Sequence, residues 1–303
     1  MITPGRHQEQ VVEKFIGMPW RLIGDSMGVG KTLSGVLLDL AERRESKDGH
    51  FRTLILCTKS GLDVWRWHLV DQGVPDGRIL VIDPMDRTVF AGELAWGAHN
   101  FDYYVMHYHA LELLSFFEKV QIGRNALVWD HIILDEAQFI KNRNAKRTKI
   151  IKRQKARYRT LVSGTPADDK PQDIWSLLNF GDKKKYSSYW RFVDKYVSYT
   201  EEWNNNAGRG YRKLGGPKNV EEFHREIYPH YIRRTLPEVR GSMPPKTHNR
   251  MWVDLTDRQR KDYEDMKQFQ LARIGEDEQL TQIELSLALP RGVCRGAGVE
   301  VEQ

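Results

Sequence analysis

The chain has 303 residues, of which 40% are hydrophobic, and a formal net charge of +6. This composition is sufficient to bury one large core or two modest ones, so it argues against a largely disordered chain. The two cysteines, Cys57 and Cys294, are far apart and indicate neither a disulfide framework nor a zinc cluster. No apolar run is long enough to span a bilayer, and the N-terminus lacks the pattern of a secretion signal. We therefore expect a cytoplasmic protein without a membrane partner.

Short apolar segments alternate with longer amphipathic ones along the first half of the chain. The apolar segments cover residues 20–24, 53–58, 79–83, 103–108, 131–135 and 160–164. This alternation predicts an α/β fold in which a parallel sheet carries helices on both faces. Residues 31–44 repeat apolar side chains at helical spacing and end in two arginines, as suits the C-terminus of a helix.

The composition changes after residue 180. Residues 181–217 contain three successive lysines, many aromatic residues and the run NNNAGRG, which predicts an insertion or a helical subdomain that ends in a flexible loop. A helix is expected over 220–231, a strand over 251–255, and another helix from Thr256, where Gln259 completes a capping-box pattern. We expect four parts: a nucleotide-binding lobe over 1–180, a helical and basic insertion over 181–250, a closing strand and helix over 251–289, and an irregular tail over 290–303.

The most specific motif is DSMGVGKT, which lies between a predicted strand and a predicted helix. This is the context that a phosphate-binding loop requires. Gly28 and Gly30 let backbone N–H groups approach the phosphates of ATP, Lys31 reaches the β and γ phosphates, and the Thr32 hydroxyl ligates Mg²⁺. The nucleotide-binding residues are expected to be Asp25, Ser26, Met27, Gly28, Val29, Gly30, Lys31 and Thr32. Asp25 replaces the first glycine of the commonest form of this loop, which argues against small kinases and GTPases.

A second apolar strand ends in two carboxylates, Asp135 and Glu136. Open α/β sheets bind ligands at the carboxyl ends of their strands. In a chain that also has a phosphate loop, Asp135 is expected to hold Mg²⁺, and Glu136 to orient and deprotonate the attacking water. The turn SGTP after the next strand supplies the hydroxyls of Ser163 and Thr165. We expect this turn to couple the phosphate site to a nucleic-acid site.

Positive charge is concentrated in residues 141–159, which contain ten basic residues and no acidic one. Removing these ten leaves 37 basic against 41 acidic residues in the rest of the chain. The segment is either a solvated helix face, as most charge runs are, or a surface for an anionic partner that relieves the repulsion between like charges. Arg209, Tyr211 and Arg212 have two similar interpretations, as part of a nucleic-acid track or as a disordered loop.

These elements, in this order, resemble the first RecA-like lobe of superfamily-two helicases, and within it the Swi/Snf-type remodeller ATPases. The resemblance covers about residues 6–265. RHQEQ (6–10) is similar to the family's glutamine motif, which makes Gln8 the expected adenine contact and Gln10 the alternative. LILCTKSGLDVW (54–65) is similar to motif Ia, and Ile140, Lys141 and Asn142 after the acidic box are the most specific match. Three further segments resemble motif III and the closing part of the lobe: residues 163–180, YIRRT (231–235) and DLTDRQRKDY (254–263).

The resemblance implies an ATP- and Mg²⁺-dependent enzyme driven by double-stranded DNA, whose backbone it contacts without reading bases. It implies catalytic roles for Lys31, Glu136 and Gln138, and a second RecA-like lobe, in cis or in trans, whose arginines complete the site. DNA contacts are expected from Lys59, Lys141, Asn142, Arg143, Lys146 and Arg147. Because motifs of the second lobe are missing, we expect ATP binding with slow hydrolysis. The alternatives are a helicase of another superfamily-two branch and a nucleotide-dependent binding module that does not hydrolyse ATP.

Three residues depart from the family pattern. Ser26 and Gln138 stand where most members have Glu and His, and Leu236 stands where they have Lys. Gln138 can still donate a hydrogen bond to motif III, so we expect altered coupling rather than lost nucleotide binding. No nuclear signal or chromatin-reading segment is recognised, and a bacterial or phage setting is therefore expected.

Overall fold

The computed structural model describes residues 2–46, 50–83, 101–113, 129–166, 170–204, 209–240, 254–261, 263–264 and 266–267. The chain forms two compact units, residues 1–241 and residues 242–303. The first unit contains the sheet and all of the predicted nucleotide-binding residues.

The first unit is built on a seven-stranded sheet with the order β3-β4-β2-β5-β6-β1-β9, and every neighbouring pair is parallel. Its strands are β1 (Trp20–Ile23), β2 (Thr53–Cys57), β3 (Ile79–Ile82), β4 (Tyr103–His107), β5 (Trp129–Leu134), β6 (Ala156–Val162) and β9 (Tyr231–Ile232). The predicted fold is confirmed. Because β5, β6 and β1 are adjacent, the loops at their carboxyl ends lie side by side.

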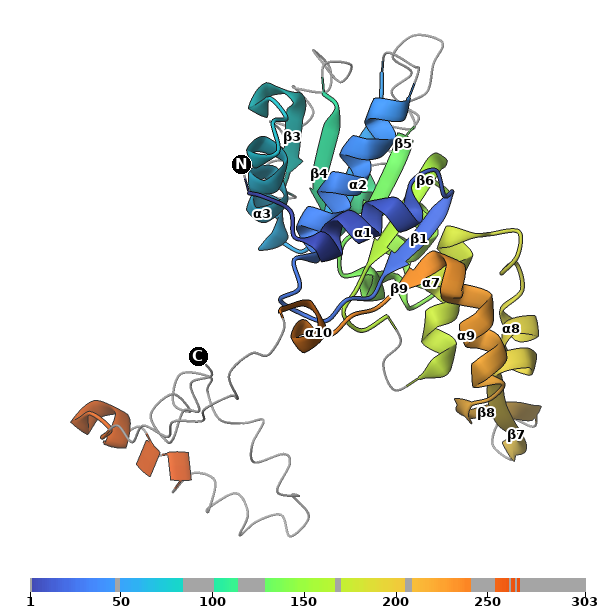
Figure 1. Cartoon of the computed structure of the whole chain (residues 1–303). Helices are drawn as coiled ribbons and strands as arrows, with labels where there is room; N and C mark the ends of the chain where they lie inside the picture. Colours follow the sequence, from blue (N-terminus) through green and yellow to red (C-terminus); the bar gives the residue numbers. More distant parts are fainter. Residues whose placement is uncertain are drawn as a thin grey trace. The chain divides into compact units, whose positions relative to one another are not determined.

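Helices cover both faces of the sheet. Alternate residues of β2 point to opposite faces, so that Leu54 and Leu56 belong to one apolar cluster and Ile55 and Cys57 to another. Figure 1 shows α1 (Arg6–Phe15), α2 (Lys31–Glu45) and α3 (Gly61–Asp71) on one face. The helices of the other cluster are α6 (Lys146–Ile151), α7 (Ile174–Gly181), α8 (Tyr189–Tyr196) and α9 (Val220–Ile227). The other short helices among the described residues of this unit are η1 (Asp76–Arg78), η3 (Tyr108–Leu113), η4 (Ala137–Ile140), η5 (Pro171–Asp173), η6 (Tyr228–His230) and α10 (Leu236–Arg240).

The segment after residue 180 differs from its prediction in two ways. It contains an antiparallel hairpin, β7 (Val197–Asn204) with β8 (Arg209–Pro217), which was not expected. The expected loop falls largely on residues 205–208, which lie outside the described residues. The valine, threonine and aromatic residues of β7, together with Tyr211 of β8, favour this pairing. The chain then returns to the sheet, because β9 pairs with β1 through Leu22↔Tyr231 and Ile23↔Ile232. The four-part division of the chain stays a prediction.

A network of buried charged and polar side chains links α2 to the middle of the sheet. The carboxylate of Asp39 accepts hydrogen bonds from Thr53 at 2.6 Å and from Tyr103 at 2.7 Å, and its Oδ1 lies 2.6 Å from Nδ1 of His131. Burial lowers the pKa of His131 to about 4, so the neutral ring donates its Nδ1–H to Asp39 and accepts at Nε2, which lies 2.7 Å from the Thr160 hydroxyl. Each buried polar group here has a partner, as a stable core requires.

In the second unit the predicted start of a helix at Thr256 is confirmed. The backbone N–H of Thr256 donates to Gln259 Oε1 at 3.1 Å, and the backbone N–H of Gln259 donates to Thr256 Oγ1 at 3.4 Å. Helical residues follow from 257. Most of the strand predicted over 251–255, and the whole tail over 290–303, lie outside the described residues.

Candidate functional site

The predicted phosphate loop connects β1 to α2 and opens that helix. Gly28 and Gly30 have φ values of +80° and +83°, the left-handed conformation that glycine adopts at no steric penalty. Gly30 is the N-cap of α2, and Lys31 is its first residue. The Lys31 ammonium donates to the backbone oxygen of Ser26 at 3.0 Å, across the mouth of the loop. A helix N-terminus with an ammonium beside it is suited to binding an anion.

Asp25 holds this loop from the inside. Its side chain is fully buried, and its carboxylate forms an ion pair with the guanidinium of Arg234. Asp25 Oδ1 also accepts the backbone N–H of Arg234 at 2.9 Å. The same guanidinium donates to the backbone oxygen of His7 on α1. Asp25 is therefore an anchor for the loop, and Arg234 is a site residue whose function the sequence pattern did not reveal.

Helix α1 is attached to the phosphate loop through Gln8. The Gln8 side chain accepts the backbone N–H of Gly5 at 2.9 Å and donates to the backbone oxygen of Gly30 at 3.1 Å. Gln10, the alternative adenine contact, lies 3.5 Å from Arg234 instead. Of the two glutamines, Gln8 contacts the phosphate loop, as does the neighbouring His7 through the backbone oxygen of Val29 at 3.0 Å. The adenine contact of either glutamine stays a prediction.

The acidic box follows β5, at the same edge of the sheet. Asp135 Oδ2 accepts the indole N–H of Trp65 at 2.8 Å, and the backbone oxygen of Asp135 accepts the Tyr108 hydroxyl at 2.7 Å. Burial raises the pKa of Asp135, while the hydrogen bond from Trp65 and the charge of Lys31 oppose that rise. Glu136 has a φ of +49°, a conformation in which non-glycine residues are strained and which is frequent at functional sites.

A continuous chain of hydrogen bonds joins the acidic box to the turn after β6. Gln138 donates to Glu136 Oε2 at 2.7 Å, and the Ser163 hydroxyl donates to Gln138 Oε1 at 2.7 Å. Ser163 Oγ in turn accepts the backbone N–H of Thr165 at 3.1 Å. A Cβ added to Gly164 would lie 3.6 Å from the Lys31 ammonium. The predicted loop, acidic box and coupling turn therefore meet at one place.

The residues at this place suit Mg²⁺ as well as phosphate. Thr32 offers a hydroxyl in the first turn of α2, and Asp135 offers a carboxylate close enough to Lys31 for their charges to interact. Hard oxygen ligands of this kind suit Mg²⁺, which usually keeps several waters and takes only one or two protein carboxylates. No group of three or more His, Cys, Asp or Glu residues able to hold a metal occurs among the described residues.

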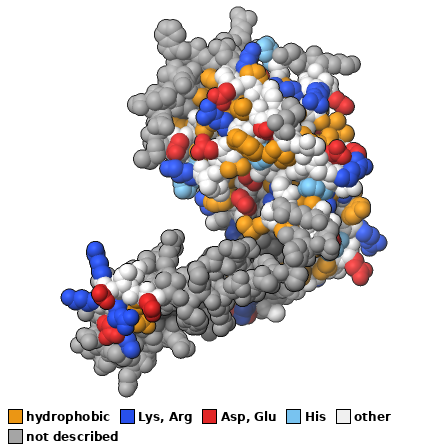
Figure 2. Space-filling model, turned by 60° about the vertical axis from the view of Figure 1, so that its left-hand side comes forward, with side chains coloured by type: hydrophobic (Ala, Val, Ile, Leu, Met, Phe, Trp, Pro, Cys, Tyr) orange, Lys and Arg blue, Asp and Glu red, His pale blue; other side chains and the backbone are white. Residues whose placement is uncertain are grey.

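The basic segment 141–159 does not form one helical face, so that interpretation is wrong. It is divided among the turn after η4, the short helix α6 and the start of β6. Several of its cations have partners: Lys146 pairs with Glu112 at 2.8 Å, and Arg147 lies 5.7 Å from the ring centre of Phe139. Figure 2 shows basic and acidic side chains interspersed on the face that it draws.

The other expected nucleic-acid residues differ in their surroundings. Lys59, at the carboxyl end of β2, is 71% exposed and lies 3.6 Å from Asp83. Arg212, on the hairpin, pairs with Asp194 at 2.9 Å and lies 4.4 Å from the ring centre of Tyr199. Its contacts are those of a residue that stabilises the hairpin, and an open nucleic-acid track is not needed to explain them.

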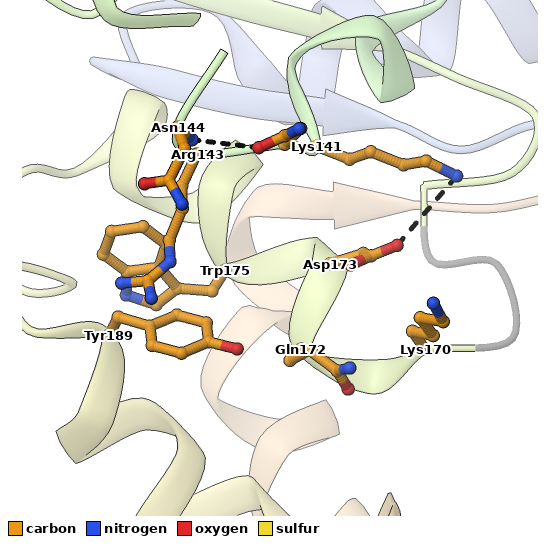
Figure 3. A pocket seen from close by; sticks show the side chains of 9 residues that line it. Lys141, Arg143, Asn144, Lys170, Gln172, Asp173, Trp175 and Tyr189 are labelled. Atoms are coloured by element: carbon orange, nitrogen blue, oxygen red, sulfur yellow. Dashed lines mark hydrogen bonds and ion pairs between the residues drawn. The ribbon is translucent and has the colours of Figure 1, made fainter. Parts of the chain in front are cut away.

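Three of the expected DNA contacts line a pocket of about 550 Å³. Lys141, Asn142 and Arg143 form one wall of it, and the loop before α7 forms another (Figure 3). Lys141 lies 3.9 Å from Asp173 across the pocket. The residues of the loop before α7 were not predicted as site residues, because no sequence motif marks them and only folding brings the two loops together.

The SNF2-related domain model matches residues 7–296. The chain belongs to this family. The SNF2-related chain is 28% identical over 271 residues to the ISWI chromatin-remodeling complex ATPase CHR17 of Arabidopsis thaliana, covering 88% of this chain and 23% of that protein. It is 30% identical over 253 residues to the human SWI/SNF-related matrix-associated actin-dependent regulator of chromatin subfamily A member 1, covering 80% of this chain and 21% of the relative.

A solved structure gives the same fold. The SWI2/SNF2 ATPase core of Sulfolobus solfataricus in complex with dsDNA superposes with a TM-score of 0.60 at 23% identity, covering 93% of this chain and 55% of that one. This SNF2-related chain thus spans under a quarter of the two curated relatives above and just over half of the solved core. Among the described residues, no helix has the length and apolarity to cross a membrane.

Proposed function

We propose that this chain is the ATP-binding first lobe of a DNA-dependent ATPase and translocase, which hydrolyses ATP to ADP and phosphate when a second RecA-like lobe completes the site. The observation that carries the proposal is the hydrogen-bonded chain from Glu136 through Gln138 to Ser163, beside Lys31 and the phosphate loop. A carboxylate near the γ phosphate and a linked turn are what coupling of hydrolysis to a second ligand requires.

Each residue has a defined role in this proposal. The backbone N–H groups after Gly28 and the Lys31 ammonium bind the β and γ phosphates. Glu136 orients the attacking water and accepts its proton, and the Gln138 amide holds the carboxylate in place. Mg²⁺, held by Thr32 and Asp135, would neutralise phosphate charge. Ser163 and Thr165 respond to DNA, because they lie on the turn that contacts Gln138.

The limited coverage of the relatives supports a requirement for a second lobe. In P-loop ATPases an arginine supplied from outside the phosphate loop raises turnover by about 10³ to 10⁵. No arginine of the described loops at the carboxyl edge of the sheet contacts Lys31 or Glu136. We therefore propose that the lone chain binds ATP and turns it over slowly.

The test measures ATP binding and turnover with and without duplex DNA, and then with an added second lobe. Lys31→Ala is expected to weaken ATP binding by about 10- to 100-fold, since it removes a charged hydrogen-bond donor. Glu136→Gln is expected to keep ATP binding and to lower turnover by about 10² to 10⁴. The matched controls are Lys184→Ala and Glu45→Gln, both exposed residues outside the site.

The outcomes separate the candidate functions. DNA-stimulated turnover that needs the second lobe supports the proposal. ATP binding that responds to DNA without turnover, even with the second lobe, indicates the nucleotide-dependent binding module. Strand separation in a parallel assay indicates a helicase of another superfamily-two branch. If Lys31→Ala and Glu136→Gln behave like their controls, the assignment of the site is wrong.

A further inference from the structure

The pocket beside η4 is rich in hydrogen-bond donors. Its lining comes from three parts of the fold: the turn after η4, the loop before α7 together with the first turn of that helix, and the start of α8 (Figure 3). Three of the lining side chains are basic and one is acidic. The lining residues are Lys141, Asn142, Arg143, Asn144, Lys170, Gln172, Asp173, Trp175 and Tyr189.

Two of these cations lack an acidic partner among the described residues. Arg143 stacks on Tyr189, with 3.8 Å between its guanidinium carbon and the ring centre. That stacking fixes the plane of the guanidinium but uses none of its five N–H donors. Lys170 likewise forms no ion pair with any residue that the structure describes. By contrast, Lys141 faces Asp173, so the single carboxylate of the pocket is already engaged.

An indole N–H and a partly buried lysine lie beside these cations. Trp175 is only 8% exposed, and its indole N–H has no hydrogen-bond partner within the described part of the chain. The ammonium of Lys152 lies 4.7 Å from the ring centre of Trp175. Burial and repulsion from Arg143 and Lys183 lower the pKa of Lys152 to about 7. A buried donor without a partner is unfavourable unless a ligand or water accepts its hydrogen bond.

We infer that this pocket binds a phosphodiester group of a nucleic-acid strand, held by Arg143, Lys170 and the indole N–H of Trp175. The inference rests on the proposed function and assigns it a specific contact. The donors come from separate elements and therefore approach from several directions, which suits a tetrahedral phosphate better than a planar carboxylate. The neighbouring amides of Asn142 and Asn144 supply further donors for phosphate oxygens.

The experiment measures binding of fluorescein-labelled duplex DNA to the full chain by anisotropy, at several salt concentrations. The test variants are the double substitution Arg143→Gln with Lys170→Gln, and Trp175→Phe, which keeps a six-membered aromatic ring and removes the pyrrole ring that carries the N–H donor. The control is Arg153→Gln, an exposed arginine of the same basic segment outside the pocket. ATP binding and the thermal midpoint of every variant report whether the fold and the ATP site are intact.

The double variant is expected to weaken DNA binding about tenfold, since charged hydrogen bonds are lost. For this variant, the slope of log K for DNA binding against log salt concentration is expected to become less negative by about one. Trp175→Phe is expected to weaken binding a fewfold, and Arg153→Gln to leave it within about twofold. If the double variant binds DNA like the control, the inference is wrong while the proposed function stands. Binding of a fluorescein-labelled poly-glutamate peptide is measured in parallel. If the double substitution weakens binding of that peptide and not of DNA, the inference is also wrong, and an acidic protein partner is indicated. A wild-type chain that binds no duplex DNA overturns both.

Discussion

The hydrogen bond from Trp65 to Asp135 permits a sharp test of how the carboxylate proposed to hold Mg²⁺ is oriented. Trp65 is fully buried in α3, and a Cβ added to Gly35 on α2 would lie only 2.8 Å from its ring. The ring therefore has no room to turn, and its N–H fixes Asp135 Oδ2 at 2.8 Å. The other oxygen, Oδ1, accepts the backbone N–H of Glu136 at 3.0 Å. Trp65→Phe keeps an aromatic side chain and removes this donor.

The expected result is a loss of Mg²⁺ affinity that exceeds the effect on folding. Removing a residue that hydrogen-bonds a metal ligand typically lowers metal affinity by about 10- to 100-fold. The smaller ring should also lower the free energy of unfolding by about 1–3 kcal/mol. The assay is fluorescence of a labelled ATP analogue titrated with Mg²⁺. We expect Trp65→Phe to raise the Mg²⁺ midpoint and to leave metal-free nucleotide binding unchanged.

Two controls on the same helix separate orientation from stability. Trp67→Phe alters a tryptophan that is 53% exposed, and it should change neither quantity. Leu69→Ala removes a buried side chain of α3 that does not contact Asp135, and it should lower the free energy of unfolding by about 2–5 kcal/mol. If Leu69→Ala shifts the Mg²⁺ midpoint as far as Trp65→Phe does, or if Trp65→Phe shifts it by less than twofold, the reasoning is refuted.

Three further predictions concern charge. DNA affinity of the wild type should fall as pH rises from 6 to 8, because Lys152 loses its proton around its pKa of about 7. Anisotropy should show a weaker pH dependence of DNA affinity for Lys152→Gln. The same pH dependence in the variant and the wild type would contradict this prediction. Burial lowers the pKa of His131 to about 4, so between pH 6.5 and pH 4 this histidine is protonated in the unfolded chain but not in the folded one. Urea titrations should therefore show the free energy of unfolding falling by up to about 3 kcal/mol from pH 7 to pH 4. Arg234→Met leaves the buried carboxylate of Asp25 unpaired and should lower the free energy of unfolding by about 3 kcal/mol, together with ATP affinity. Arg233→Met, at an exposed neighbour, is the matched control, and equal melting temperatures of the two variants would count against the role of the ion pair.

Local patterns predicted much of the fold and of the ATP site. The phosphate loop is recognisable because each of its requirements, a glycine at a positive φ, an ammonium and a hydroxyl, selects a residue type at a set spacing. The strands are recognisable because a doubly covered parallel sheet needs short continuous apolar runs. The expectation that Gln138 donates a hydrogen bond to motif III is wrong, because the Ser163 hydroxyl donates to Gln138 Oε1 while the Gln138 amide donates to Glu136.

The insertion and the basic segment were harder to predict. The Asn- and Gly-rich run of residues 204–210 was interpreted as a loop, and the hairpin that β7 and β8 form on either side of residues 205–208 was not predicted. The ten cations of residues 141–159 are contiguous only in sequence. A turn, a short helix and a strand orient them differently, so that some acquire partners within the fold, as Lys146 and Arg147 do.

The sequence by itself determined the motif DSMGVGKT, the acidic strand end and the turn SGTP, because each motif depends on residues that are close along the chain. Only the tertiary structure decided which distant residues support them. Arg234 is 209 positions from Asp25, and Trp65 is 70 positions from Asp135. Such pairs form because adjacent parallel strands bring their carboxyl ends together, and no local pattern records which strands are adjacent.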